Sequence, residues 1–473
     1  MKFTILSHAG LLVEHAGTRL VCDPWLLGSC YWRSWWNFPE PDPALVADLR
    51  ADYIYLTHLH WDHFHGPSLR RLFGPGIRVL IPKVLTRRMV EDLRYLGFHS
   101  ITEIPHGGRV VLGEDFALRS YQFGLGVDSG VVVSGGGVNL FNCNDAKFFG
   151  LPLRQILRDT PRIDFIFRSH SSAAPIPYCV ENYERILPQT VAQTDAADQF
   201  ARCALHVGAR YAIPFASNHC FLHRETVRFN HTATTPEDVR RHYSELATRA
   251  GVQSECVVMP PGSSRSAASG FDVRPFDFAA RPQYIETMLA RHAATLESCY
   301  REEDAATADF TSFKSYFTGL LQTLPRPLRR RFLAPIVFRT RDAAGERNWL
   351  IDPRRGVVEA LASAPVGCTI LEVHPALLRD CATKRMFSVW SASKRVRITL
   401  PDAAAVAGLH RWFTVLDLYE LDMLPISRNF SARSLALRAR RWREPVELAR
   451  LALHRLLGRK PLSIALLYPV KAA

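Results

Sequence analysis

A cluster of metal-ligand side chains constrains this chain more than any other feature. His58, His60, Asp62 and His63 form the pattern H-x-H-x-D-H within six residues. They directly follow the apolar run 53–56, which predicts a short buried strand. These four side chains can converge only if the backbone turns sharply at the strand end, which is where open α/β sheets bind their ligands. The pattern therefore predicts a metal site and not a histidine-rich surface loop.

Two aspartates lie at the edges of later predicted strands. Asp128 precedes the apolar run 131–133, and Asp145 follows the run 138–141. As ligands, these aspartates would make the site dinuclear and rich in oxygen, which favours iron or manganese over zinc. The alternative is that each is a turn or cap residue, a common role of aspartate.

A last imidazole ligand is expected from a later strand end. The segment 211–223 offers His219 and His223, and the pattern does not choose between them. We expect these two histidines, together with Asp62, to include the catalytic side chains. Asp23 ends an early strand and is expected either to hold a ligand imidazole by a hydrogen bond or to start a turn with the following proline.

Three further residues are candidates for substrate contacts. His170 and Arg168 lie together in a predicted loop, where arginine suits an anionic group and the histidine is alternatively a hydrogen-bonded loop residue. Trp36 belongs to an aromatic segment, residues 31–38, that either forms a pocket wall or buries a long loop.

The chain divides into two predicted domains. Short β-branched strands and amphipathic helices alternate over residues 1–265, and a Pro/Gly/Ser-rich stretch at 260–264 marks the boundary. Residues 275–473 carry helical patterns at 282–332, 403–419 and 431–457, with strands at 334–338, 349–351 and 396–400. The fold class is therefore α/β, followed by a smaller α+β domain.

These residues resemble the metallo-β-lactamase superfamily over roughly residues 1–265. Within it, the stretches 23–28 and 52–63, with Asp128 and 142–145, look closer to the hydroxylase domain of CMP-N-acetylneuraminate hydroxylases than to the lactamases. The resemblance implies an αββα sandwich with metal at one edge. Its metal ligands would be His58, His60, Asp62, His63, Asp128, Asp145 and a last histidine at His219 or His223. The hydroxylases carry a Rieske domain that needs both C-x-H and C-x-x-H; this pair is incomplete here, since no C-x-H occurs.

The resemblance and the donor set leave three functions open. The first is a diiron oxygenase or hydroxylase that uses O₂ and a separate electron donor on a small polar or anionic metabolite. The second is a zinc or manganese hydrolase of phosphodiesters, lactones or amides, with a metal-activated hydroxide as nucleophile. The third is a non-enzymatic interaction protein whose site is structural. We expect two metal ions in either enzyme.

Charge and composition set the expected partners and compartment. The net charge of +14 is concentrated late: seven arginines between 433 and 455, with Arg459 and Lys460, face two glutamates. With leucines at helical spacing, this predicts basic amphipathic helices that are either simply solvated or dock on a carrier protein or membrane surface. No nucleic-acid motif, export signal or transmembrane run is visible, and the scattered cysteines favour the cytoplasm.

Overall fold

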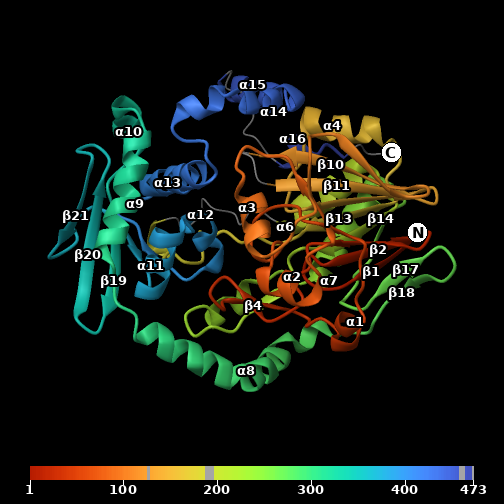
Figure 1. Cartoon of the computed structure of the whole chain (residues 1–473), viewed down its shortest axis with the longest axis horizontal. Coiled ribbons are helices and arrows are strands. Elements are labelled where there is room, and N and C mark those ends of the chain that lie inside the picture. The colour runs from red at the N-terminus through yellow and green to blue at the C-terminus, as the bar shows by residue number, and fades with distance from the viewer. Residues whose placement is uncertain (125–127, 187–195, 457–463, 471–473) are drawn as a thin grey trace.

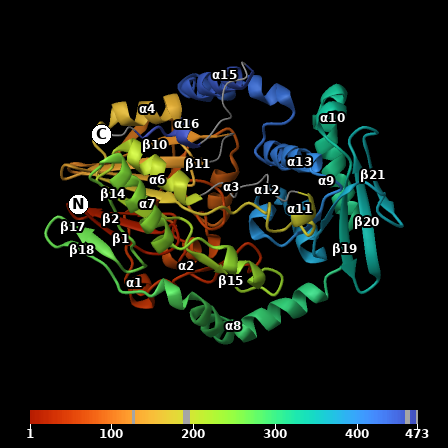
Figure 2. The same cartoon turned by 180° about the vertical axis from the view of Figure 1, so that it is seen from behind.

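The computed structural model describes residues 1–124, 128–186, 196–456 and 464–470. Arg459 and Lys460 of the basic segment lie outside these ranges. Figures 1 and 2 show a β-sandwich at one end of the molecule and a smaller sheet, β19–β21, at the other. Helix α8 (Arg281–Asp304) runs along one edge and connects the two parts.

The first sheet of the sandwich is mixed. Strands β1 to β3 are antiparallel to one another, whereas β3, β6, β7 and β8 are parallel. Its order is β18 (Gly270–Asp272), β17 (Ser264–Ser266), β1 (Lys2–Ile5), β2 (Leu11–His15), β3 (Thr18–Cys22), β6 (Tyr53–Tyr55), β7 (Arg78–Pro82) and β8 (Ile101–Ile104).

The second sheet has the same half-antiparallel, half-parallel design. Strands β9 to β12 are antiparallel neighbours, and β12, β13, β14 and β16 are parallel. Its order is β16 (Glu255–Cys256), β14 (Tyr211–Phe215), β13 (Phe165–Ser169), β12 (Val138–Asn144), β11 (Asp128–Gly135), β10 (Phe116–Phe123) and β9 (Gly108–Gly113).

Alternating side chains build the layers of the sandwich. In β11, Val131 and Val133 enter the core between the two sheets, while Val132 enters the core on the helical side. From the facing sheet, Phe3 places its ring 5.0 Å from the ring of Phe165 and 5.2 Å from that of Phe167. Every second residue of these strands therefore faces the opposing sheet, as the pleat requires.

Helices cover both outer faces. Helices α2 (Gly66–Leu72) and α3 (Arg88–Tyr95) pack on the first sheet, and α4 (Gly150–Asp159), α6 (Ala196–Val207) and α7 (Pro236–Ala250) pack on the second. Helix α7 begins at a Thr235–Asp238 capping box and ends at Gly251, which has a φ of 66°. The expected αββα sandwich is thus confirmed.

Shorter elements surround the sandwich. A small sheet joins β15 (His219–Phe221), β5 (Trp35–Asn37) and β4 (Ser29–Cys30). Two short helices, α1 (Pro43–Ala47) and α5 (Tyr183–Ile186), lie in its connecting segments.

The C-terminal part is α+β, as expected. Its sheet has the order β21 (Val357–Leu361), β20 (Gly345–Asp352), β19 (Ile336–Asp342), β22 (Thr369–Glu372) and β23 (Arg397–Thr399). The helices around it are α9 (Phe310–Thr323), α10 (Arg326–Phe332), α11 (Pro375–Lys384), α12 (Phe387–Trp390) and α13 (Ala404–Glu420).

The two parts of the structure do not correspond to two continuous halves of the chain. The first sheet continues through β18 to Asp272, past the expected boundary at 265. The last helices, α14 (Ala432–Arg440), α15 (Arg443–Leu456) and α16 (Ile464–Leu467), return to the sandwich, where the Tyr468 hydroxyl donates to the Phe148 carbonyl at 2.9 Å. The end of the chain therefore packs on the N-terminal part.

Among the described residues, no helix combines the length and apolar character needed to cross a lipid bilayer.

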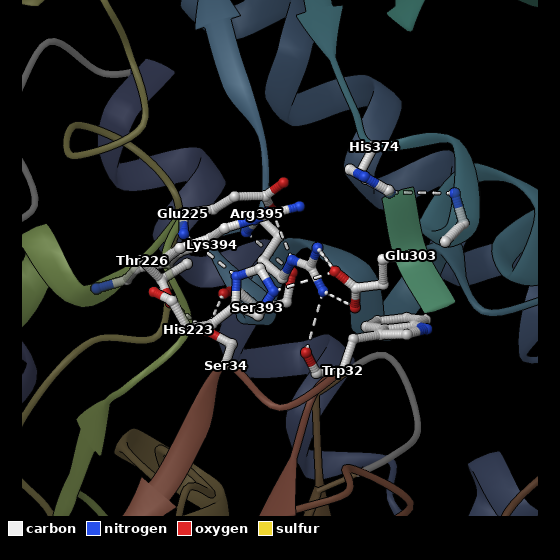
Figure 3. Close-up of polar contacts among 12 residues, drawn as sticks. Trp32, Ser34, His223, Glu225, Thr226, Glu303, His374, Ser393, Lys394 and Arg395 are labelled. Atoms are coloured by element: carbon white, nitrogen blue, oxygen red, sulfur yellow. Dashed lines mark hydrogen bonds and ion pairs between the residues drawn. The ribbon is translucent and has the colours of Figure 1, made fainter. Parts of the chain in front are cut away.

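A buried ion-pair network joins the two parts (Figure 3). Arg395, which precedes β23, donates both terminal nitrogens to the Glu303 carboxylate at 2.7 Å and its Nε to Glu225 at 2.6 Å. The Glu303 carboxylate also lies 3.1 Å from His223 Nε2. Arg395 is 2% exposed, so these bonds form in a low-dielectric interior where an unpaired partner is very unfavourable.

We predict that Arg395→Met lowers the free energy of unfolding by about 3–5 kcal/mol, because two carboxylates lose their cation inside the protein. Arg341→Met is the matched control: among the described residues its carboxylate partner is Glu346 at the surface, and its loss should cost under about 1 kcal/mol. Urea unfolding of both variants measures the difference. Equal losses for the two variants would contradict a stabilising buried network.

Candidate metal centre

The candidate site lies at one edge of the sandwich, where strands from both sheets end. Asp23 follows β3, the motif 57–63 follows the parallel neighbour β6, and Asn144 and Asp145 come at the end of β12. Strand β11 runs antiparallel to β12 with Val131 opposite Asn142, so Asp128 at its start lies at the same edge. The topology therefore gathers donors from three distant segments.

Two groups of ligand atoms face one another at this edge. One group is formed by His58, His60 and Asp145, and the other by His8, Asp62 and His63. Within each group, the ligand atoms all lie within 4.8 Å of one another. The structure thus brings together five of the residues expected as metal ligands and adds His8.

His63 and Asp145 connect the two groups. His63 Nε2 lies 3.3 Å from Asp62 Oδ2 and 3.3 Å from Asp145 Oδ2. The same Asp145 oxygen is 3.9 Å from His58 Nε2, which in turn lies 2.8 Å from His60 Nδ1. A carboxylate placed between two imidazole groups is suited to bridging two ions.

Asp128 lies beside these groups but makes no contact with them at hydrogen-bond distance. Its Oδ1 is buried without a hydrogen-bond partner, and the charges that act on it are those of His60, Asp145, Lys147 and His63. Burial raises the pKa of Asp128, because the lost hydration of its charged form outweighs the stabilising charges of His60, Lys147 and His63.

Asp23 connects the segments that carry the site residues through hydrogen bonds. It accepts hydrogen bonds from the Thr57 backbone amide at 2.8 Å, the Thr57 hydroxyl at 2.7 Å and the Asn144 side-chain amide at 2.5 Å. His63 Nδ1 lies 2.9 Å from the same carboxylate. This bond places the proton on Nδ1 and leaves the Nε2 lone pair directed at Asp62 and Asp145.

Asp62 is held by two residues that the sequence did not single out. The Tyr31 hydroxyl donates to its Oδ1 at 2.5 Å, and His8 Nε2 lies 3.0 Å from its Oδ2. His8 directly follows the first strand, at the same sheet edge as the motif, and this position was the available signal. Tyr31 lies in the aromatic segment, where nothing distinguishes it from its neighbours.

The buried charges of these donors shift one another's pKa values. Although burial opposes it, the carboxylates of Asp62 and Asp23 raise the pKa of His63. Burial, with His63 and His60 nearby, lowers the pKa of His58. The pKa of Asp145 is lowered despite its burial, because His63 and His58 stabilise its anion. The cluster thus presents ionised carboxylates beside imidazoles.

The residues fit a pair of metal ions. His63 Nε2, His8 Nδ1 and Asp128 Oδ1 are buried and have no hydrogen-bond partner in the described structure, which is unfavourable unless something else satisfies them. Their lone pairs, with the neighbouring carboxylates, form the mixed nitrogen and oxygen donor set of iron, manganese or zinc.

The two candidates for the last imidazole are in different places. His219 is buried, its ring stacked 3.6 Å from that of Trp35 and 5.6 Å from that of His8, so it lies next to the site but outside both donor groups. His223 is not at the metal centre. Its Nε2 contacts Glu303 in the interface network, which corrects its assignment as a catalytic residue.

The structure also corrects the expected substrate contacts. Arg168 faces the helical side of its sheet, where it donates to the Gln199 carbonyl and lies over the Tyr468 ring. Trp36 packs against α8, with its ring 4.1 Å from that of His292. Strand alternation explains both, because the neighbouring Phe167 and Trp35 take the opposite faces.

His170 is fully buried and lies near His8 and the Phe215 backbone. Burial, and then the charge of His8, lowers the pKa of His170 to about 3, so it is a neutral imidazole. The structure therefore places His170 inside the protein and not on a substrate-facing surface.

Curated proteins are similar to parts of this chain. A protein of Mycolicibacterium smegmatis described as a putative Rieske 2Fe-2S iron-sulfur protein is 31% identical over 255 residues, covering 50% of this chain and 48% of that protein. The cytidine monophosphate-N-acetylneuraminic acid hydroxylase of Pongo pygmaeus is 40% identical over 84 residues, 17% of this chain and 14% of that enzyme. The chain thus spans at most about half the length of these relatives. No protein-family model matches it.

Solved structures are similar over the sandwich. The isothiocyanate hydrolase from Delia radicum gut bacteria has a TM-score of 0.41 at 15% identity and covers 56% of this chain and 99% of its own. A variant of CmlA β-hydroxylase has a TM-score of 0.39 at 17% identity, covering 56% of this chain and 53% of its own.

The fold assignment follows from the chain itself. Two mixed sheets face each other between helical layers, and two groups of metal-donor side chains lie near the ends of β1, β6 and β12. The residues of these two groups could hold a pair of metal ions. The chain thus has the αββα sandwich of the metallo-β-lactamase fold, and part of its sequence is similar to a CMP-N-acetylneuraminic acid hydroxylase.

Proposed function

We propose that this protein is a diiron oxygenase that hydroxylates a small polar or anionic metabolite with O₂. The observation that carries the proposal is the oxygen-rich donor set. Asp62 and Asp145 supply a carboxylate to each donor group, and the unpartnered Oδ1 of Asp128 lies beside them as a third. Harder donors of this kind favour iron or manganese over zinc. Bound iron would supply the O₂ and C–H chemistry that side chains lack.

The chain's own residues position the donors. Asp23 fixes the tautomer of His63, and the Thr57 hydroxyl, 3.0 Å from His58 Nδ1, does the same for His58. Both histidines therefore turn Nε2 toward Asp145. Tyr31 and His8 fix the two oxygens of Asp62, so the carboxylate cannot rotate freely. Preorganised ligands of this kind need little rearrangement during a reaction.

The curated relatives support oxidative chemistry. One is described as a Rieske iron-sulfur protein and the other as a hydroxylase. The sequence lacks the C-x-H half of a Rieske motif. We therefore propose that electrons come from a separate donor protein.

A zinc- or manganese-dependent hydrolase is the second candidate. Three imidazoles from one motif, His58, His60 and His63, suit zinc, which would supply a nucleophile by lowering the pKa of bound water. Such an enzyme would turn over a phosphodiester, lactone or amide without O₂.

Metal content and oxygen dependence test the proposal. Protein produced with iron in the medium should contain about two irons per chain, and substrate turnover should consume O₂ and place its oxygen in the product. Oxygen-isotope labelling followed by mass spectrometry measures this transfer. A preparation that takes up only zinc under these conditions, or that hydrolyses esters without O₂, would replace the oxygenase with the hydrolase.

We predict that His63→Ala and Asp145→Ala each lose at least one metal ion per chain, because these side chains contact both donor groups. His231→Ala is the control, since this exposed imidazole contacts only the Arg228 carbonyl. Elemental analysis of the three folded variants gives the stoichiometry. Full metal content in Asp145→Ala would show that the site is built differently.

We predict that Asp23→Asn weakens metal binding about 10- to 100-fold, because an amide in place of the carboxylate no longer fixes the His63 tautomer. Chelator competition measures the affinity. The exposed Asp52, which accepts only from the Arg19 amide, provides the control Asp52→Asn with unchanged affinity. An unaltered affinity in Asp23→Asn would remove its positioning role.

A further inference from the structure

Helices α14 and α15 expose an apolar surface. Trp442, directly before α15, and Val446 and Leu453 within it recur at helical spacing on one face, next to the exposed Ala449. About half of each of these three side chains is accessible to solvent. The outward apolar residues, named here the α14–α15 face, are Leu435, Trp442, Val446 and Leu453.

The acidic and basic residues of these helices lie on different sides. The acidic residues, Glu444 and Glu447, both turn toward the protein. The exposed charged residues are Arg438, Arg440 and Arg450. Solvent therefore meets a surface of apolar and arginine side chains only, whereas a solvated helix shows its polar side and buries its apolar one.

The inward glutamates fix this orientation. Glu447 is 4% exposed, and its Oε2 accepts from the Leu151 amide at 3.1 Å, at the start of α4. Glu444 accepts from the Gly124 amide at 3.0 Å and pairs with Arg441. A carboxylate at a helix N-terminus is favourable, and rolling α15 to bury Trp442 would expose that bond and break it. The apolar face is thus held outward.

Beneath the same helices lies a largely apolar cavity of about 360 Å³. Leu437 and Leu448 form one side, and Leu418, Met423 and Leu424 form the other. Figure 1 places α14 and α15 at the outer edge of the molecule, and Figure 2 shows α15 there from behind.

We propose that the α14–α15 face docks on an anionic lipid membrane. Trp and Leu side chains with surrounding arginines are typical of helices that lie in the bilayer interface. Arginines add attraction to acidic headgroups, roughly fivefold in affinity each. An acidic protein would satisfy the arginines, but the apolar cavity under the helices fits a lipid chain better than a charged surface. The proposal is independent of the reaction at the metal centre.

Vesicle binding of the full chain tests the proposal. The protein should co-sediment with vesicles of phosphatidylglycerol and phosphatidylcholine, and much less with phosphatidylcholine alone. Binding should weaken as salt is raised, because the arginine contribution is screened. Absence of binding to the anionic vesicles, or equal binding to both kinds, would overturn the proposal.

Two variants assign the binding to this face. Trp442→Ser with Leu453→Ser should bind at least tenfold more weakly and keep the melting temperature, because both side chains are already half exposed. Arg440→Glu should also weaken binding on the order of tenfold, since it reverses the charge of an exposed arginine. The control is Leu328→Ser with Phe332→Ser on α10, an arginine-rich helix with exposed apolar residues, and it should bind like the native chain.

Two outcomes would assign the face to another partner and overturn the proposal. Native-like vesicle binding in Trp442→Ser with Leu453→Ser would place lipid contact elsewhere. A concentration-dependent dimer that disappears in the same variant, measured by analytical ultracentrifugation, would make a second copy of this chain the occupant.

Discussion

The site depends on one buried carboxylate. Asp23 has no exposed surface, yet it is contacted by Thr57, His63 and Asn144, which come from two other strand ends and both sheets. A buried anion must be satisfied, so these segments cannot move apart without leaving it unpaired. Asp23 and Asn144 both adopt a positive φ, of 44° and 46°, a conformation that Asp and Asn tolerate better than most residues. One side chain thus connects the strand ends at this edge and also fixes the tautomer of His63.

Much of this arrangement could be predicted from the sequence, because it depends on local patterns. Alternating apolar residues predict the strands of the sandwich, and the cap and C-terminal glycine of the Pro236–Ala250 helix are local signals of its ends. The motif after β6 predicts a turn that gathers His58, His60 and His63. Strand alternation also explains why Arg168 and Trp36 are not substrate contacts, because each follows a residue that takes the opposite face of its strand.

Other features depend on contacts between distant segments, which the sequence does not display. His8 and Asp62 are joined across two strands, and Tyr31 reaches Asp62 from a loop with several similar aromatic residues. His223 was expected at the site because it follows a later strand end. Its partner, Glu303, lies on a helix eighty positions later in the chain. The pattern of residue types along one sequence does not show which distant residues are in contact.

The C-terminal part takes part in the site, although it supplies none of the expected ligands. Trp61 within the motif stacks on Tyr31, and the neighbouring Trp32 donates to Asp380 of α11 at 3.0 Å. Trp35, which lies against His219, belongs to the same core cluster as Phe313 and Trp390. The wall that orients Asp62 is therefore packed against the second half of the molecule. The buried Arg395 network fixes the position of the two parts relative to each other. The geometry of the metal centre therefore depends on the whole chain and not on the sandwich alone.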